Sequence, residues 1–172
     1  IVGKLLATGM SSWLVVLIAL LIGMLIGVLN GFIVVQLGVN PFITTLGTMS
    51  FFSGLAFILS AGQTVSIRDP LFDWFLYTKI FSIPVLVIIV VFVMALAYFI
   101  ERKTVVGRNV FAIGGNKEAA RLSGISTKML PLSLYVTSSL SAAVAGVVLV
   151  SQLGAASPHV GTAYLLSVVT AV

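Results

Sequence analysis

The sequence predicts an all-α integral membrane protein, a polytopic bundle of transmembrane helices. Apolar residues make up 60% of the 172-residue chain and charged residues only 8%. Nearly all of these charges gather in two polar segments that separate long apolar stretches. A soluble domain of this size has about a quarter charged residues. Because so few charges cannot cover a water-facing surface, the bilayer is the natural solvent for this chain.

The first apolar stretch is long enough for two spanning helices. It runs over residues 5–67 without an Asp, Glu, Lys or Arg, and one span needs about 20 mostly apolar residues. The break is expected at Pro41, because proline lacks an N–H donor and pushes the preceding residue away from α geometry. The first two spans are therefore placed near 12–36 and 42–60.

The rest of the chain predicts two more complete spans and one partial span. The polar loop 61–79 comes first, with a short surface helix expected at 73–77. Full spans are expected near 80–100, with Pro84 in the first turns, and near 130–152. Residues 159–172 are typical of a span that is cut short. The chain is thus interpreted as one transmembrane domain of four full spans and a truncated one, a fragment of a larger protein.

Loop charge predicts the orientation of the spans. Cytoplasmic loops carry an excess of Lys and Arg. Loop 101–128 holds six such residues, namely Arg102, Lys103, Arg108, Lys117, Arg121 and Lys128, whereas loop 61–79 holds only Arg68 and Lys79. Loop 101–128 is therefore expected in the cytoplasm together with 37–41. Loop 61–79, the first residues and 153–158 are expected outside.

Small residues recur at helical spacing on two of the spans. Gly23, Gly27 and Gly31 share one face of the first span, and Ser138, Ala142 and Gly146 share one face of the fourth. Such stripes let another helix backbone approach closely. Packing within one subunit is the simpler explanation, and a subunit interface or a surface that moves during transport is the alternative.

The predicted spans contain no Asp, Glu, Lys or Arg, and this pattern favours a neutral solute. Proton-coupled pumps and voltage sensors usually need charged groups within the membrane. Uncharged polar residues are present instead, and four of them are candidates for a translocation path: Asn30, Thr44, Thr45 and Thr48. The simpler explanation for any one of them is a hydrogen bond to a neighbouring helix backbone.

Residues 116–124 of the polar loop predict a short helix of about two turns. Gly114 and Gly115 are expected to break the chain before it, and Asn116 can cap it by accepting from a free N–H. Glu118 in the first turn suits the helix dipole, and Gly124 is a suitable terminator. Because so short a helix is unstable alone, it should dock on something. Ala119 and Ala120 would offer another protein a flat side.

These residues carry a resemblance to a known family. Glu118-Ala119-Ala120, followed after three residues by Gly124, resembles the EAA signature of ABC importer permeases. In that family the loop forms the coupling helix that rests in a groove of the ATPase subunit. The stretches at 29–31, 40–49, 107–125 and 157–161 are similar to the ribose-type permeases in particular. The resemblance covers about 27–172 and implies an ATPase-coupling set of Asn116, Glu118, Ala119, Ala120, Arg121 and Gly124.

The resemblance implies a multi-pass subunit of the bacterial inner membrane that moves a monosaccharide or sugar-like solute into the cytoplasm. Its implied partners are an ABC ATPase that holds ATP and Mg²⁺, a second permease subunit in a homo- or heterodimer, a periplasmic sugar-binding protein and membrane lipid. No cofactor on this chain and no nucleic acid are implied. An ion-coupled secondary transporter or a non-transporting membrane subunit remains the alternative.

The sequence predicts no catalytic residue and no metal site. His159 is its only histidine, whereas metal sites usually need three or four ligands. Residues 114–117 lack the full spacing and the Ser or Thr of a phosphate-binding loop. Hydrolysis of ATP is therefore expected on another subunit, and the chain is not expected to be an enzyme.

Overall fold

The computed structural model describes residues 2–67, 69, 72, 74, 78–80, 83–158 and 160–170. Within this part of the chain, four helices are long and apolar enough to cross a membrane: α2 (Ser12–Val35), α3 (Pro41–Ser60), α5 (Val85–Lys103) and α8 (Met129–Leu153). Arg68, His159 and most of the surface helix predicted at 73–77 lie outside the described residues. The fold is a helical membrane bundle, as the sequence predicts.

Helices α2, α3 and α8 begin and end within one residue of the ranges expected from the sequence. Local chemistry fixes the start of α3. The Asn40 side chain accepts from the N–H groups of Phe42 at 2.9 Å and Ile43 at 3.4 Å. Pro41 occupies the first helical position, where no N–H partner is needed.

Helix α5 differs from the span predicted at 80–100. It begins at Val85, because Ile83–Pro84 (β3) pair in antiparallel fashion with Lys79–Ile80 (β2). Pro84 therefore precedes the first turn instead of lying within it. At the other end the helix continues to Lys103, so the first three residues of the predicted loop 101–128 are helical. Basic residues in this last turn suit the negative end of the helix dipole.

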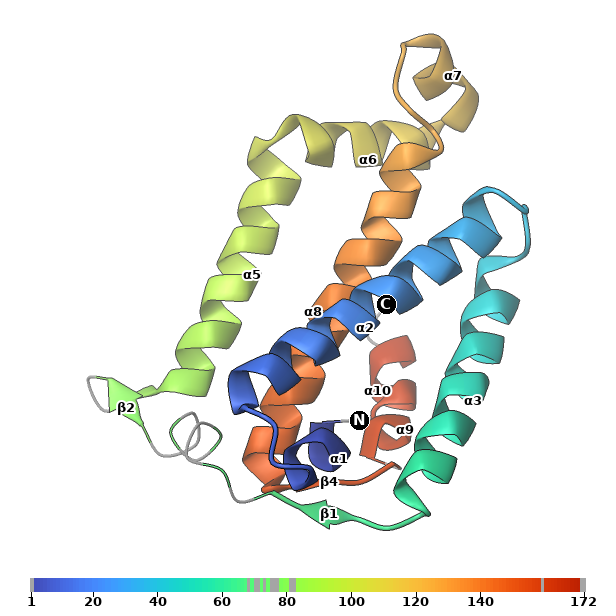
Figure 1. Cartoon of the computed structure of the whole chain (residues 1–172). Helices are drawn as coiled ribbons and strands as arrows, with labels where there is room; N and C mark the ends of the chain where they lie inside the picture. The colour runs from blue at the N-terminus through green and yellow to red at the C-terminus, as the bar shows by residue number, and fades with distance from the viewer. Residues whose placement is uncertain are drawn as a thin grey trace.

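A helix that the sequence did not predict, α6 (Val105–Gly115), joins α5 to the short α7 (Lys117–Leu122). It runs across the ends of α5 and α8 (Figure 1). The expected break at Gly114-Gly115 was wrong, since both glycines belong to α6 and the chain leaves α geometry only at Asn116. The corner between α5 and α6 requires Gly107, because a Cβ there would collide with the Glu101 carbonyl.

The glycine stripe of α2 packs against α8 of the same chain. A Cβ added to Gly27 would lie 2.8 Å from both the Tyr135 carbonyl oxygen and Val136 Cα, and one added to Gly23 would lie 2.6 Å from Ala143 Cβ. The small stripe predicted on α8 is not the partner. Its members Ser138, Ala142 and Gly146 are exposed, because the neighbouring face of α8 meets the glycines.

The opposite end of the bundle is closed by short elements. Val65–Ser66 (β1) pair with Ala155–Ala156 (β4) in antiparallel fashion. The short helix α1 (Val2–Ala7) lies against both strands, with its buried Gly3 facing them. This end lies far from α6 and α7 (Figure 1). The loops predicted to share the outside therefore share one end of the molecule, and 104–128 lies at the other.

The partial fifth span is two short helices, α9 (Val160–Ala163) and α10 (Leu165–Thr170), rather than the single helix predicted over 159–172. The N–H of Tyr164 bonds the Gly161 carbonyl at 3.3 Å. This bond joins residues three apart, as in a 3₁₀ turn, whereas bonds of an α-helix join residues four apart. The backbone is therefore wound more tightly between α9 and α10.

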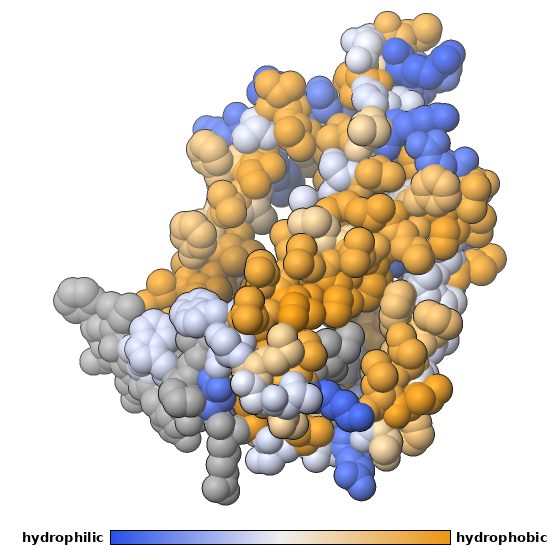
Figure 2. Space-filling view, viewed as in Figure 1, coloured by the Kyte–Doolittle hydropathy of each residue, from blue (hydrophilic) through white to orange (hydrophobic). Residues whose placement is uncertain are grey.

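The long helices leave most of their apolar side chains exposed. Trp13, Phe42, Phe51, Ile58 and Phe92 are each more than 60% exposed. Figure 2 shows apolar residues over the middle of the molecule and hydrophilic ones mainly toward its ends. Such a surface suits lipid tails and further helices instead of water.

Candidate functional site

Two capping motifs hold α7 in a defined shape. At its start, Asn116 Oδ1 accepts from the N–H groups of Glu118 and Ala119, both at 3.0 Å. At its end, Gly124 has φ +79° and donates to the Arg121 carbonyl, while Ile125 donates to the Ala120 carbonyl. These two bonds form a Schellman motif. Both predicted caps are confirmed.

The predicted flat side of α7 is only partly available to another protein. Ala119 is exposed, but Ala120 is buried at 3% exposure. The Schellman bond from Ile125 carries the chain back over this alanine. The expectation that both alanines face a partner was therefore wrong for Ala120, which is buried within its own chain.

Glu118 and Arg121 pair with each other on the surface of α7. Arg121 Nη2 lies 2.6 Å from Glu118 Oε1, and both side chains are about two-thirds exposed. An acidic group of a partner protein would have to compete with this pair for Arg121. Exposed pairs of this kind contribute little to stability, so the exchange is energetically accessible.

Exposed apolar residues flank α7, and the sequence analysis missed them. Leu122 at the end of α7 is 78% exposed, Met129 is 66% exposed and Phe111 in α6 is 62% exposed. All three belong to the most basic end of the chain. Leu122 and Met129 could have been recognised as apolar residues at helix ends of an otherwise polar loop, whereas Phe111 lies inside α6 and gives no such signal.

Three of the four candidate path residues line one cavity between α2, α3 and Pro158. The cavity measures about 360 Å³. Its lining residues are Ile26, Asn30, Thr45, Thr48, Met49, Phe52, Ser53, Ala56 and Pro158. Thr44 is buried and does not line it; its hydroxyl donates to the Asn40 carbonyl at 3.0 Å. Adjacent residues of a helix point in different directions, so Thr44 and Thr45 cannot both face the cavity.

Asn30 is the exceptional residue of this cavity. It is only 8% exposed, and its Oδ1 has no hydrogen-bond partner within the described part of the chain. An unsatisfied buried acceptor typically costs about 1–3 kcal/mol. Sequence reasoning missed Phe52 and Met49 as members of the wall, since both read as ordinary apolar residues of a span.

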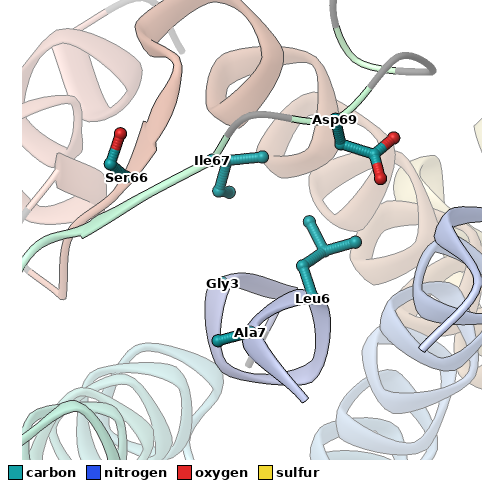
Figure 3. A pocket seen from close by; sticks show the side chains of 6 residues that line it. All are labelled: Gly3, Leu6, Ala7, Ser66, Ile67 and Asp69. Carbon is teal, nitrogen blue, oxygen red and sulfur yellow. The ribbon is translucent and has the colours of Figure 1, made fainter. Parts of the chain in front are cut away.

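Two further cavities lie between this site and the β1–β4 end, and neighbouring cavities share wall residues. One of about 360 Å³ shares Ala56 and Pro158 with the Asn30 cavity. The next, of about 450 Å³, shares Gly3 with the second. Figure 3 shows this last cavity between α1 and the segment of Ile67 and Asp69. The three cavities follow one another along the molecule with common wall residues.

The Asp69 carboxylate joins the outer cavity to the start of α2. Ser12 Oγ donates to Asp69 Oδ2 at 2.6 Å, and Ile67 N–H bonds the Gly154 carbonyl at 2.9 Å. These two bonds tie the segment after β1 to both α2 and the turn before β4. Within the described residues, no three His, Cys, Asp or Glu side chains gather in a way that could hold a metal ion.

Comparison with known proteins identifies the family. Residues 1–172 match the family described as the permease component of the branched-chain amino acid transport system. The L-arabinose transport system permease protein of Escherichia coli (strain K12) is 38% identical over 142 residues, covering 83% of this chain and 43% of that protein. No solved structure matches the chain.

Two further relatives cover still more of the chain. The D-allose transport system permease protein of Escherichia coli (strain K12) is 35% identical over 165 residues, covering 95% of this chain and 51% of that protein. The ribose import permease protein of Bacillus subtilis (strain 168) is 34% identical over 174 residues, covering 100% of this chain and 54% of that protein. The chain therefore spans about half the length of the curated relatives it matches.

These matches and the four apolar helices define the class of protein. The chain belongs to the monosaccharide-type permease family of ABC importers, whose members are multi-pass proteins of the bacterial inner membrane. The family resemblance drawn from the sequence is thereby confirmed.

Proposed function

We infer that this chain is part of an importer subunit that passes a monosaccharide or sugar-like solute into the cytoplasm, with energy supplied by a separate ATPase. The observation that carries the inference is α7, a helix capped at both ends and flanked by the exposed Leu122 and Met129. Membership of a permease family and three relatives named as sugar permeases support it.

In this proposal α7 is the coupling helix that docks on the ATPase. Leu122 is 78% exposed, and docking would remove this apolar side chain from water, which is favourable. Asn116, Glu118, Ala119, Arg121 and Gly124 would shape or contact the docking surface. The buried Ala120 would instead transmit force from α7 to the rest of its own subunit.

Force on α7 would reach the membrane helices through short and stiff connections. Helix α6 packs against α5, α7 and α8. The close fit of Gly107 on the Glu101 carbonyl leaves no slack at the corner between α5 and α6. A displacement of α7 would therefore tilt α5 and α8 together, which is the kind of rigid-body change that opens a path on one side of a membrane.

The solute would follow the three consecutive cavities between the β1–β4 end and Asn30. Asn30, Thr45 and Thr48 would line its inner part, and Thr44 would support α3 without contacting solute. A sugar-binding protein would deliver the solute at the β1–β4 end. A second permease subunit and lipid would cover the exposed apolar faces, and ATP with Mg²⁺ would bind the partner ATPase.

Co-purification of the full-length permease with its candidate ATPase tests the proposal. We expect the unaltered protein to retain the ATPase in mild detergent. Leu122→Glu and Glu118→Lys should each reduce the retained ATPase at least tenfold, about 1.4 kcal/mol of binding free energy. Lys4→Glu is the matched control, because it alters an exposed charge at the opposite end of the molecule.

Two outcomes would contradict the inference. In the first, the unaltered protein retains no ATPase and transports solute under an ion gradient, so that ion-coupled secondary transport replaces the importer assignment. Alternatively, both α7 variants could retain as much ATPase as the Lys4→Glu control, in which case α7 is not the docking element.

A further inference from the structure

Helices α5, α6 and α8 enclose a cavity that lies apart from the proposed solute path. The cavity measures about 650 Å³, within the range of about 300–1,000 Å³ that ligand sites span. Helix α6 runs across the ends of α5 and α8 and bounds the cavity on the side of α7 (Figure 1). Most of the wall is apolar, with Val93, Leu96 and Ile100 from α5 and Leu134 and Leu140 from α8.

The apolar face of α6 borders this cavity and is left uncovered. Val106, Val110 and Phe111 line the cavity, and Val106 and Phe111 are 45% and 62% exposed. Arg108 of the same helix is exposed and does not belong to the wall. A helix that lies along a membrane surface turns its apolar face toward the acyl chains and its basic face toward the headgroups. The position of α6 across the ends of two spanning helices suits that arrangement.

The hydroxyl groups of the wall do not require a polar ligand. Ser133 donates to the Leu130 carbonyl at 2.7 Å, Thr137 donates to the Ser133 carbonyl at 3.1 Å, and Ser141 donates to the Thr137 carbonyl at 2.9 Å. Each hydroxyl has one donor, and in these three it is used within α8. Hydrocarbon can therefore lie against this side of α8 without leaving a hydroxyl proton unpaired.

Three exposed cations lie at the helix ends around the cavity. Lys103 ends α5, Arg108 lies in α6 and Lys128 directly precedes α8. None of the three has an ion-pair partner among the described residues. Glu101 is the one charged residue among the described residues of the wall, so its carboxylate offsets part of this positive charge. Basic residues beside a groove between membrane helices on the cytoplasmic side are typical of sites for anionic headgroups.

One kind of molecule satisfies both the apolar wall and the cations. An acyl chain needs no hydrogen-bond partner and can follow an irregular apolar surface, while the phosphate of the same lipid stays at the membrane surface beside the basic side chains. A free phosphate ion would leave the apolar wall uncovered. A lipid without net charge would gain less from the cations, because attraction to basic residues near the surface grows with negative headgroup charge.

We propose that the cavity between α5, α6 and α8 binds an anionic phospholipid of the cytoplasmic leaflet. Its acyl chain would lie against the apolar face of α6, and its phosphate beside Lys103, Arg108 and Lys128. The proposed site requires the membrane location of the family and the orientation predicted from charge, but no particular solute. A lipid bound there would brace the corner through which α6 joins α5 to α7.

Quenching of an introduced tryptophan by brominated lipids measures occupancy of the site. Phe111→Trp places the reporter in the cavity wall of the full-length permease, with its other tryptophans replaced by phenylalanine. The protein is reconstituted in vesicles of phosphatidylcholine and phosphatidylglycerol in which one lipid at a time carries brominated acyl chains. Ile58→Trp is the control reporter, because Ile58 is 74% exposed near the end of α3 and lies outside this cavity.

We expect phosphatidylglycerol to be preferred over phosphatidylcholine at least fivefold at position 111 and less than twofold at position 58. Joint replacement of Lys103, Arg108 and Lys128 by Gln should reduce the preference at position 111 to less than twofold. Glu101→Gln should raise it, because that change removes a like charge. Lys117→Gln is the matched control, since it removes an exposed cation of α7 and should leave the preference nearly unchanged. High salt should weaken the preference by screening the charges.

Contrary outcomes are distinguishable from one another. If neither brominated lipid quenches Phe111→Trp, protein from the rest of the permease fills the cavity and the proposal is overturned. Equal quenching by both lipids, or a preference that survives removal of the three cations, would show ordinary lipid contact without a headgroup site and would also overturn it. Unchanged quenching by brominated phosphatidylcholine in the triple variant verifies that its fold persists. The co-purification experiment decides the importer assignment independently.

Discussion

Two asparagines show how surroundings decide the role of one amide side chain. Asn116 lies at the exposed start of α7, where its Oδ1 accepts from two otherwise free N–H groups. Asn30 lies in the last third of the apolar helix α2, and its Oδ1 is buried without a partner among the described residues. The first arrangement stabilises the local fold. The second destabilises it unless a ligand, a water molecule or another part of the protein supplies a donor.

Replacement of the α7 cap should loosen α7 without unfolding the bundle. Asn116→Ala removes the acceptor for two N–H groups, and loss of such a cap typically costs about 1 kcal/mol. We expect amide hydrogen exchange at Glu118 and Ala119 to accelerate about fivefold while α2 and α8 stay protected. Asn116→Asp keeps an acceptor and should exchange like the unaltered protein. Equal acceleration in both variants would show that the cap does not hold α7.

Local signals explain which residues of the candidate site could be predicted from the sequence. Asn116 and Gly124 act on their immediate neighbours, so spacing alone identifies them as caps. The burial of Ala120 depends on the path of the chain after Gly124, which no local pattern specifies. Thr44 and Thr45 are equivalent in sequence, and only the position of α2 beside α3 decides that Thr45 faces the cavity.

At the scale of elements, the contact between α2 and α8 is the main packing interaction of the bundle. Gly23, Gly27 and Gly31 place the α2 backbone directly against α8. In a bilayer the hydrophobic effect does not drive helices together, so close van der Waals packing has to do so. A side chain inserted at this contact would push α2 away from α8 and so weaken the most extensive helix–helix contact of the chain.

Gly27→Ala should therefore separate α2 from α8. Its Cβ would lie 2.8 Å from two backbone atoms of α8, and backbone cannot move aside as a side-chain end can. Overpacking of this kind typically costs about 1–3 kcal/mol, and we expect a lower melting temperature for the full-length protein in detergent. Gly146→Ala is the control, since no atom lies within 4 Å of its added Cβ. A greater loss in the control would indicate that the exposed stripe of α8 is the more important interface.

Sequence patterns located the long helices but not the faces by which they pack. Asn40 and Pro41 mark the start of α3 by local chemistry, so its range could be predicted. A helix that is apolar on every side has no comparable sequence signal for the face by which it packs against its neighbours. Small residues occur on two sides of α8, and the stripe with the more regular spacing turned out to be exposed. Helix α6 escaped prediction because its two terminal glycines were interpreted as a break.

The whole molecule is an open arrangement of helices with little buried core. Only Val15, Ile67, Phe72, Val85, Leu86 and Ala120 are buried apolar residues among those described. The chain spans about half the length of its curated relatives. The exposed faces of α3 and α5 are therefore suited to contacts with further helices of a full-length permease, and with lipid. Rigidity in this part of the protein comes from close backbone contacts and capped turns instead of a core.

The distribution of charge predicts which end of this molecule faces the cytoplasm. The end with α6 and α7 carries most of the Lys and Arg residues, and the positive-inside rule places it in the cytoplasm. The proposed docking of an ATPase on α7 requires the same orientation, because ATP is cytoplasmic. A single thiol tests it, since the chain has no cysteine of its own. Thr64→Cys near β1 and Ser123→Cys after α7 both replace exposed residues at opposite ends.

In cells with a permeabilised outer membrane, a membrane-impermeant maleimide should label the full-length Thr64→Cys protein in a cysteine-free background. Ser123→Cys should be labelled only after the inner membrane is also opened. The reverse pattern would place α7 outside the cell, where no ATPase could reach it. It would contradict the proposed coupling role of α7. Orientation is therefore the property of the whole molecule on which the functional roles of both sites depend.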